Sequence, residues 1–126
     1  MASDLNQVNI DGRLVEAPKI KLLDGGMRVA TMRIASNRYY KGREDPEWKE
    51  KTSYIDVKAW NTIADAVADM RKGEPVHIEG SLGQEQWTDA EGKQHNMVLI
   101  EANKVEPREL NREKAASRNQ EAGVEL

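Results

Sequence analysis

Two large aromatic side chains stand among charges on one face of a strand predicted for Thr52–Trp60. Successive side chains of a strand point to opposite sides, so Tyr54 and Trp60 share their face with Asp56 and Lys58. The opposite face is small and apolar, and it consists of Ile55, Val57 and Ala59. Rings exposed between charges can stack on a flat, negatively charged ligand. The alternative is that both rings cover a second apolar cluster.

A second group of aromatic residues falls in the segment Asn37–Lys51, which is polar and contains Gly42 and Pro46. This composition predicts a long, mobile hairpin loop. Its three aromatic and five basic side chains are interleaved: Tyr39, Tyr40 and Trp48, with Arg38, Lys41, Arg43, Lys49 and Lys51. An exposed loop of this kind favours either a finger that grips a ligand or a contact with another protein. A solvated loop whose rings fold back on the hairpin is the alternative.

The N-terminal third predicts three strands. Alternation over Val8–Leu14 indicates a half-buried strand, in which Gly12 suggests a bend, a bulge or a close approach of another backbone. Strands over 19–23 and 27–36 are expected to form a hairpin, because the Asp-Gly-Gly turn between them supplies positive φ angles. The core side of the returning strand carries Ala30, Met32 and Ile34.

The one convincing helix follows the strand that ends at Trp60. Asn61 or Thr62 can cap it, and Gly73 can end it. Its apolar residues have helical spacing: Ile63, Val67 and Met70. Its last turn is expected to carry two cations, which the helix dipole favours there: Arg71 and Lys72. We expect this slim helix to plug one end of the fold.

The remaining chain predicts a second hairpin and a tail. Strands over 75–80 and 82–88, broken by Gly80-Ser81, return after a turn at 89–92 as a strand over 94–105, so Trp87 lies beside the turn. The sequence then becomes polar, with few large apolar residues, which divides the chain into a domain at 1–106 and a disordered or partly helical tail at 107–126. About five strands, with a helix between the third and fourth, are typical of a mainly β OB-fold. This five-stranded Greek-key barrel binds strands of nucleic acid or sugar on its open face and loops.

Composition excludes several classes of site. The chain of 126 residues contains no cysteine and two histidines, so disulfides, thiol catalysis, cysteine-ligated zinc and a histidine-rich metal site are not expected, and we predict no cofactor. The net charge of −3 does not indicate a nucleic-acid binder, so such a function must depend on local patches. With no long apolar run and no basic segment followed by one near the start, we expect a cytoplasmic protein without a membrane partner.

Six segments, in this order, resemble the bacterial single-stranded DNA-binding protein family: MAS at the start, VNIDGRL, DGGMRVATMRIASNRYY, TSYIDVKAWNTIAD, RKGEPVHIEGSL and WTDAEGK. The likeness covers Met1 to about Val105. It implies an OB-fold, usually assembled as a homotetramer, that wraps single-stranded DNA without sequence preference and catalyses nothing. Its expected setting is DNA replication, recombination and repair in the bacterial cytosol or nucleoid.

The resemblance also implies site residues. The stacking aromatics of the family match Tyr40, Tyr54, Trp60 and Trp87, and Trp48 in the predicted loop is a further stacking candidate. The cations expected to follow the phosphates are Lys21, Arg33, Arg38, Lys41, Arg43, Lys58, Arg71 and Lys72. Stacking accepts any base because every base has a π face.

Three departures from the family pattern modify this expectation. The segment Gly83–Gln86 carries Glu85 where the family usually has several basic residues, and Asp56 lies on the predicted binding face. We therefore expect weaker binding that depends more on stacking. The Gly/Pro/Gln-rich linker and acidic tip of the family are absent from this sequence, which ends EAGVEL. Recruitment of replication or repair proteins is therefore in doubt, and a specialised paralogue or one from a phage or mobile element is indicated.

Other functions and assemblies stay open at this point. The acidic balance favours an accessory OB-fold subunit that acts through protein contacts in a primosome or recombination complex, whereas four retained aromatics oppose it. An enzyme would need a cluster of acid, base and nucleophile, but the glutamates are scattered over strands and turns: Glu74, Glu79 and Glu85. The alternation over Val8–Leu14 offers an edge strand for pairing between subunits. The resemblance implies a tetramer, with a dimer as the alternative.

Overall fold

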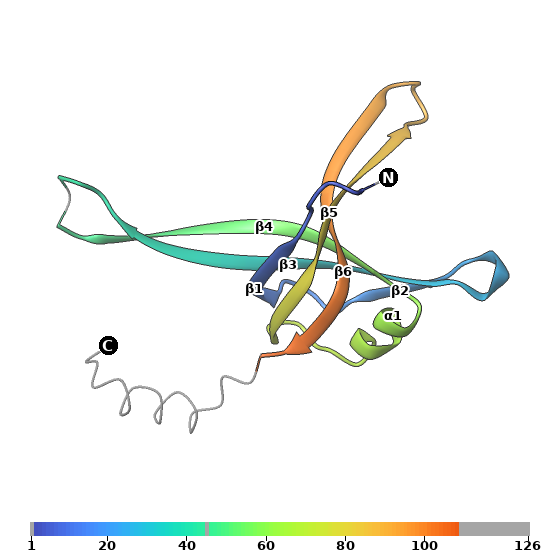
Figure 1. Ribbon diagram of the computed structural model, residues 1–126, viewed down its shortest axis with the longest axis horizontal. Coiled ribbons are helices and arrows are strands. Elements are labelled where there is room, and N and C mark those ends of the chain that lie inside the picture. The colour runs from blue at the N-terminus through green and yellow to red at the C-terminus, as the bar shows by residue number, and fades with distance from the viewer. Residues whose placement is uncertain (1, 45, 109–126) are drawn as a thin grey trace.

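The computed structural model describes residues 2–44 and 46–108, and most of these residues lie in long antiparallel strands (Figure 1). The elements are, in chain order, β1 (Val8–Leu14), β2 (Lys19–Leu22), the 3₁₀ turn η1 (Asp24–Gly26), β3 (Arg28–Lys41), β4 (Trp48–Trp60), α1 (Thr62–Val67), β5 (Pro75–Thr88) and β6 (Gln94–Pro107). In the described residues, no helix has the length and apolar character needed to cross a bilayer.

Five of these strands close into a barrel. Neighbouring strands pair in the order β1-β5-β6-β4-β3, and β1 pairs again with β3, which completes the ring. The closing contact between β4 and β6 is parallel and short, with Val57 beside Ile100 and Lys58 beside Glu101. Within the described part of the chain, β2 pairs with β3 alone and lies outside the ring. Helix α1 therefore lies between the third and fourth strands of the barrel, which confirms the predicted OB-fold.

The barrel interior contains the side chains that alternation predicted. Ala30, Met32 and Ile34 of β3 are buried. Val57 and Ala59, their neighbours on the adjacent strand β4, are buried too. Further buried residues come from the other strands and the helix: Leu14, Ala64, Val67, Val76, Ile78, Ile100 and Ala102. Because Ala64 and Val67 belong to the same cluster, α1 closes the barrel as expected. The first strand passes closely over β3, since a Cβ on Gly12 would lie 2.9 Å from the carbonyl oxygen of Ala35.

The prediction of a mobile loop over Asn37–Lys51 is wrong for most of that segment. The β3–β4 ladder continues through Asn37 opposite Thr52 to Lys41 opposite Trp48, so only 42–47 connect the strands. This ribbon projects far from the barrel (Figure 1). A polar sequence can form strands here because the β3–β4 ladder satisfies the backbone hydrogen bonds. The side chains on both faces of the projecting ribbon stay in water. The side chains also pair, since Thr52 Oγ1 donates to Asn37 Oδ1 at 2.7 Å.

The predicted break between two strands at Gly80-Ser81 is also wrong. Strand β5 is continuous from Pro75 to Thr88, and the register against β6 shifts between Glu79 and Gly80. A Cβ on Gly80 would lie 2.1 Å from the carbonyl oxygen of Glu101. Glycine therefore permits a close approach and a bulge rather than a chain break. Beyond the bulge, β5 and β6 leave the barrel as a second projecting arm (Figure 1).

The helix is shorter than predicted. It ends at Val67, so Met70, Arg71 and Lys72 lie in the connection to β5 and not in a last helical turn. The backbone turns away because it pairs with β1: Gly73 N donates to Leu14 O at 2.8 Å, and Leu14 N donates to Glu74 O at 3.0 Å. These tertiary hydrogen bonds override the local helix propensity.

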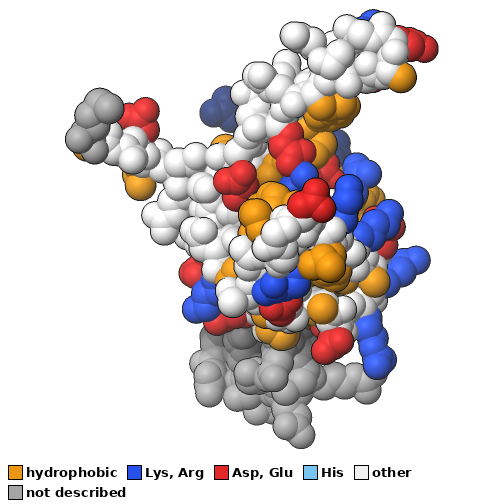
Figure 2. All heavy atoms as spheres, turned by 90° about the vertical axis from the view of Figure 1, so that its right-hand side faces the viewer, with side chains coloured by type: hydrophobic (Ala, Val, Ile, Leu, Met, Phe, Trp, Pro, Cys, Tyr) orange, Lys and Arg blue, Asp and Glu red, His pale blue; other side chains and the backbone are white. Residues whose placement is uncertain are grey.

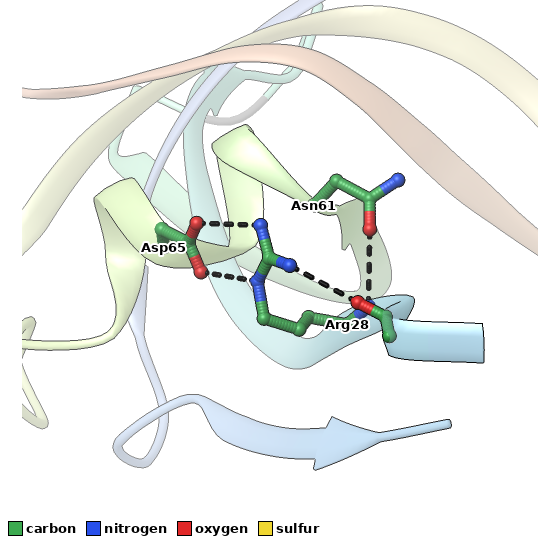
Figure 3. A network of polar contacts seen from close by, with 4 residues as sticks. Arg28, Asn61 and Asp65 are labelled. Atoms are coloured by element: carbon green, nitrogen blue, oxygen red, sulfur yellow. Dashed lines mark hydrogen bonds and ion pairs between the residues drawn. The ribbon is translucent and has the colours of Figure 1, made fainter. Parts of the chain in front are cut away.

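The helix start is tied to β3 by polar contacts instead of a side-chain cap (Figure 3). Asn61, with a positive φ of 51°, accepts a hydrogen bond from Arg28 N through its Oδ1 at 3.1 Å. The guanidinium of Arg28 donates two hydrogen bonds of 2.7 Å to the carboxylate of Asp65. The predicted role of Asn61 as a side-chain cap is therefore wrong, and its amide joins α1 to β3.

The Arg28–Asp65 contact predicts a pH-dependent contribution to stability. The hydrogen bonds from Arg28 lower the pKa of Asp65 from its ordinary value of 3.8. A carboxyl with a lowered pKa stabilises the fold above the pKa of the unfolded chain, and this stability is lost as the pH falls through the folded-state pKa. Asp65→Asn should lower the melting temperature slightly at pH 7, because exposed ion pairs contribute little. Circular dichroism melts at pH 7 and about pH 2.5 should show this difference shrinking in acid.

The matched control is Asp4→Asn, which removes the same charge from an exposed residue of the N-terminal segment. It should leave the melting temperature unchanged at both pH values. An Asp65→Asn effect of equal size at both pH values would contradict the assignment.

The predicted domain boundary falls within β6, which runs to Pro107. Arg108 N donates to Pro75 O at 2.8 Å, so this residue still belongs to the β5–β6 pairing. From residue 109 on, the predicted tail at 107–126 lies outside the described residues.

Candidate nucleic-acid interface

The predicted aromatic strand presents its rings on the outside of the barrel. Directly opposed residues of antiparallel strands share a face, so the register places Tyr54 beside Ala35 and Trp60 beside Val29. The side chains of Tyr54, Trp60 and Trp87 are 58%, 36% and 46% exposed. The first two therefore do not cover a second cluster within the described chain. Their strand face carries Tyr54, Asp56, Lys58 and Trp60 in alternation.

An ion pair connects this face to the β5–β6 arm. Lys58 Nζ contacts Glu85 Oε1. Glu85 and Trp87 are two residues apart on β5, so their side chains leave the strand on the same side. We call the surface formed by Tyr54, Asp56, Lys58, Trp60, Glu85 and Trp87 the outer face. The sequence predicted its aromatics, but not the ion pair at its centre.

Arg33 lies over one of the candidate stacking rings. Its guanidinium carbon is 5.4 Å from the centroid of the Tyr54 ring, within the range of a cation–π contact. The register also places Arg33 directly opposite Asp56. This cation is therefore held beside an acid and an aromatic ring, where it can meet a phosphate next to a stacked base.

Two lysines of β2 lie in rows with the outer face. Lys21 is opposite Val29, which is opposite Trp60, and Lys19 is opposite Thr31, which is opposite Lys58. The sequence identified Lys21 but missed Lys19, although the two alternate on the same short strand. On the end of the molecule that carries this hairpin, basic, acidic and hydrophobic side chains are interspersed (Figure 2).

The tip of the β5–β6 arm has its own ring contact. Trp87 and His95 are cross-strand partners, and their rings stack with centroids 5.3 Å apart. His95 Nε2 lies 2.7 Å from Asp89 Oδ2. The hydrogen bond with His95, followed by one from the backbone N–H of Lys93, lowers the pKa of Asp89. His95, which the sequence analysis did not select as a site residue, therefore supports the orientation of Trp87.

The β3–β4 ribbon separates the remaining aromatic candidates. Trp48 is opposite Lys41 and shares its ribbon face with Tyr39, whereas Tyr40 is opposite Lys49 on the other face with Arg38. All three rings are exposed. Tyr40 and Trp48 therefore do not form one stacking surface. Tyr39 was not among the stacking candidates, yet it shares a face with Trp48.

The other cations lie at separate places. Arg43 is in the connection at the ribbon end, and Arg71 and Lys72 are in the connection between α1 and β5. None of these three belongs to the strands of the outer face. Among the residues that the structure describes, no three histidine, aspartate or glutamate side chains gather as metal ligands would.

Comparison with known proteins gives consistent matches. Residues 5–107 match the model of the Single-strand binding protein family. A single-stranded DNA-binding protein of Aquifex aeolicus is 39% identical over 123 residues, which are 97% of this chain and 81% of that protein. The corresponding protein of Deinococcus radiodurans is 36% identical over 106 residues, 84% of this chain but 35% of its own length. The chain thus spans about a third of that longer relative.

Solved structures share the fold. The SSB of Plasmodium falciparum, in complex with single-stranded DNA, superposes with a TM-score of 0.73 and 29% identity. The match covers 84% of this chain and 95% of that one. A deletion mutant of the single-stranded DNA binding protein from Thermus aquaticus superposes with a TM-score of 0.75 and 25% identity, covering 85% of this chain and 52% of that one.

Proposed function

The chain belongs to the single-strand binding protein family, and from this premise we propose that it binds and protects single-stranded DNA without sequence preference. The observation that carries the proposal is the outer face, on which Tyr54, Trp60 and Trp87 expose their rings beside Lys58. Base stacking on such rings is worth about 1–3 kcal/mol per base and tolerates any sequence.

We assign two contributions to binding. Bases stack on the outer-face rings and on the ribbon aromatics Tyr40 and Trp48. Phosphates follow cations near those rings: Lys19, Lys21, Arg33, Arg38, Lys41, Arg43 and Lys58. Arg71 and Lys72 serve as outlying contacts for a strand that leaves the outer face. The carboxylates of Asp56 and Glu85 lower the electrostatic share of the affinity, so stacking dominates.

Family membership supports a proposal for the biological setting. The names of the family and of its relatives indicate binding only, which sets the enzyme alternative aside. We propose a role in replication, recombination and repair in the bacterial cytoplasm. The accessory-subunit function, in which protein contacts replace DNA binding, is retained as the outcome that a failure of DNA binding would favour.

We also propose a homo-oligomer, and a tetramer in preference to a dimer. An apolar groove of about 300 Å³ opens between β1, β4 and the β5–β6 arm. Its exposed apolar lining is formed by Leu82 and Val98, beside Val8 and Ile10. Tyr54 and Asp56 also line it, so the groove borders the outer face. Contact with a second copy of the chain would remove this apolar surface from water.

Tryptophan fluorescence tests the proposed function directly. Addition of a homothymidine oligonucleotide should quench the emission deeply and saturably, because Trp60 and Trp87 stack on bases. The affinity should also fall as salt rises from 0.05 to 0.2 M, by about 2.6-fold for each phosphate that the assigned cations neutralise on a single strand. No quenching from a folded protein would refute DNA binding by this face and favour the accessory-subunit function.

A further inference from the structure

The cation at the centre of the outer face is already engaged. Lys58 leaves β4 between the two rings of that strand, and its ammonium contacts the Glu85 carboxylate. The side chains of Lys58 and Glu85 are 24% and 37% exposed, so the pair is only partly screened by water. A phosphate that approaches Lys58 therefore meets a neutralised cation with a carboxylate beside it.

A second carboxylate increases this effect. Glu101 is the β6 neighbour of Lys58, and its side chain lies over Gly83, where a Cβ would come 2.9 Å from Glu101 Cδ. Gly83 precedes Glu85 by two residues, so both acids line the same side of β5. Of these two acids, Glu85 is the one that contacts the Lys58 ammonium.

A phosphate can use Lys58 only by displacing Glu85. The exchange loses one ion pair to form another, and it leaves an anion beside the DNA backbone. The net electrostatic gain is small, and fewer counterions are released than a free lysine would release. Trp60 and Trp87 can still stack, because the exchange does not involve their rings.

We propose that Glu85 sets the affinity and salt dependence of single-stranded DNA binding by competing with phosphates for Lys58. This inference depends on the proposed function and adds an affinity-determining residue to it. Glu85 touches no base in this mechanism. It acts through Lys58, as a positioning residue that lowers the affinity of the stacking surface and favours rapid release.

The test is the isosteric variant Glu85→Gln, titrated with a homothymidine oligonucleotide from 0.05 to 0.3 M salt. Lys58 then becomes available to a phosphate, so affinity at the lowest salt should rise about fivefold. The slope of log K against log salt should become steeper by about 0.7, the value for one further phosphate contact on a single strand.

A double-mutant cycle separates this mechanism from a change in total charge. In the wild-type background, Lys58→Met should weaken binding by less than it does in the Glu85→Gln background, where it should cancel the whole gain of about fivefold. The matched control is Glu106→Gln, which removes the same charge from an acid 3.0 Å from Lys104 on β6. It should change neither affinity nor slope.

The outcomes distinguish the two proposals. If Glu85→Gln binds with the affinity and the salt slope of the wild type, the role of Glu85 is overturned and the proposed function stands. Equal gains for Glu85→Gln and Glu106→Gln would also overturn it, because bulk charge would then explain both. If neither the wild type nor Glu85→Gln binds the oligonucleotide, the proposed function itself fails.

Discussion

Replacing Trp60 and Trp87 together by alanine should weaken binding of a homothymidine oligonucleotide by roughly 2–6 kcal/mol, or about 30-fold to about 20,000-fold. Each indole is partly exposed and can stack on one base, and the two belong to different strands of the outer face. Because the rings are not in the barrel core, the loss should come without unfolding. The affinity is best measured by anisotropy of a labelled oligonucleotide, since the variant lacks two of three tryptophans.

A matched control is Leu22→Ala, which truncates an exposed apolar residue of β2. Leu22 follows Lys21, so its side chain points away from the outer face. The control should bind as the wild type does, and all variants should give the same melting temperature within a few degrees. Unchanged affinity of the double tryptophan variant would place the binding surface elsewhere.

The barrel could be predicted because its strands alternate cleanly. β1 has the predicted bounds, and the core residues Ala30, Met32 and Ile34 followed from period-two spacing alone. The same rule assigned Tyr54 and Trp60 to the outside of β4. Where one face of a strand is buried, a shift of one residue would expose the whole core set, so the pattern determines the register.

The ribbon could not be predicted because neither of its faces is buried. Between Asn37 and Thr52 the side chains that the structure describes are exposed or nearly so, and period-two hydrophobicity disappears. The strands persist because they continue a ladder that the barrel has already aligned. A polar sequence with Gly42 and Pro46 indicates a turn at its centre, but it does not indicate where the ladder ends.

The helix end and the site electrostatics depend on contacts between distant segments. Met70 continues the helical spacing, yet the chain turns earlier because Gly73 pairs with Leu14. In the same way, Lys58 and Glu85 are 27 residues apart, and only the closed barrel brings them together. The sequence showed the residues of the outer face without showing that its central cation is neutralised.

Gly80→Ala should destabilise the protein by about 3 kcal/mol, near the upper end of the usual cost of overpacking. The new Cβ would lie 2.1 Å from the Glu101 carbonyl oxygen, a backbone atom that cannot rotate away. The bulge at Gly80 also begins the part of β5 that carries Glu85 and Trp87. Relief of the clash must move the arm relative to β4, so weaker oligonucleotide binding should accompany the loss of stability. Urea unfolding and anisotropy titrations measure the two effects.

Gly83→Ala is the control on the same strand. Its Cβ would meet the Glu101 side chain at 2.9 Å, and a flexible carboxylate end can move aside. Stability should therefore change by less than about 1 kcal/mol, since alanine also lowers the conformational entropy of the unfolded chain. Equal losses of stability for the two substitutions would contradict the clash at Gly80, because the general effect of replacing a strand glycine would then explain both. A cost at Gly80 alone would show that the bulge joins the barrel to the arm that presents Trp87.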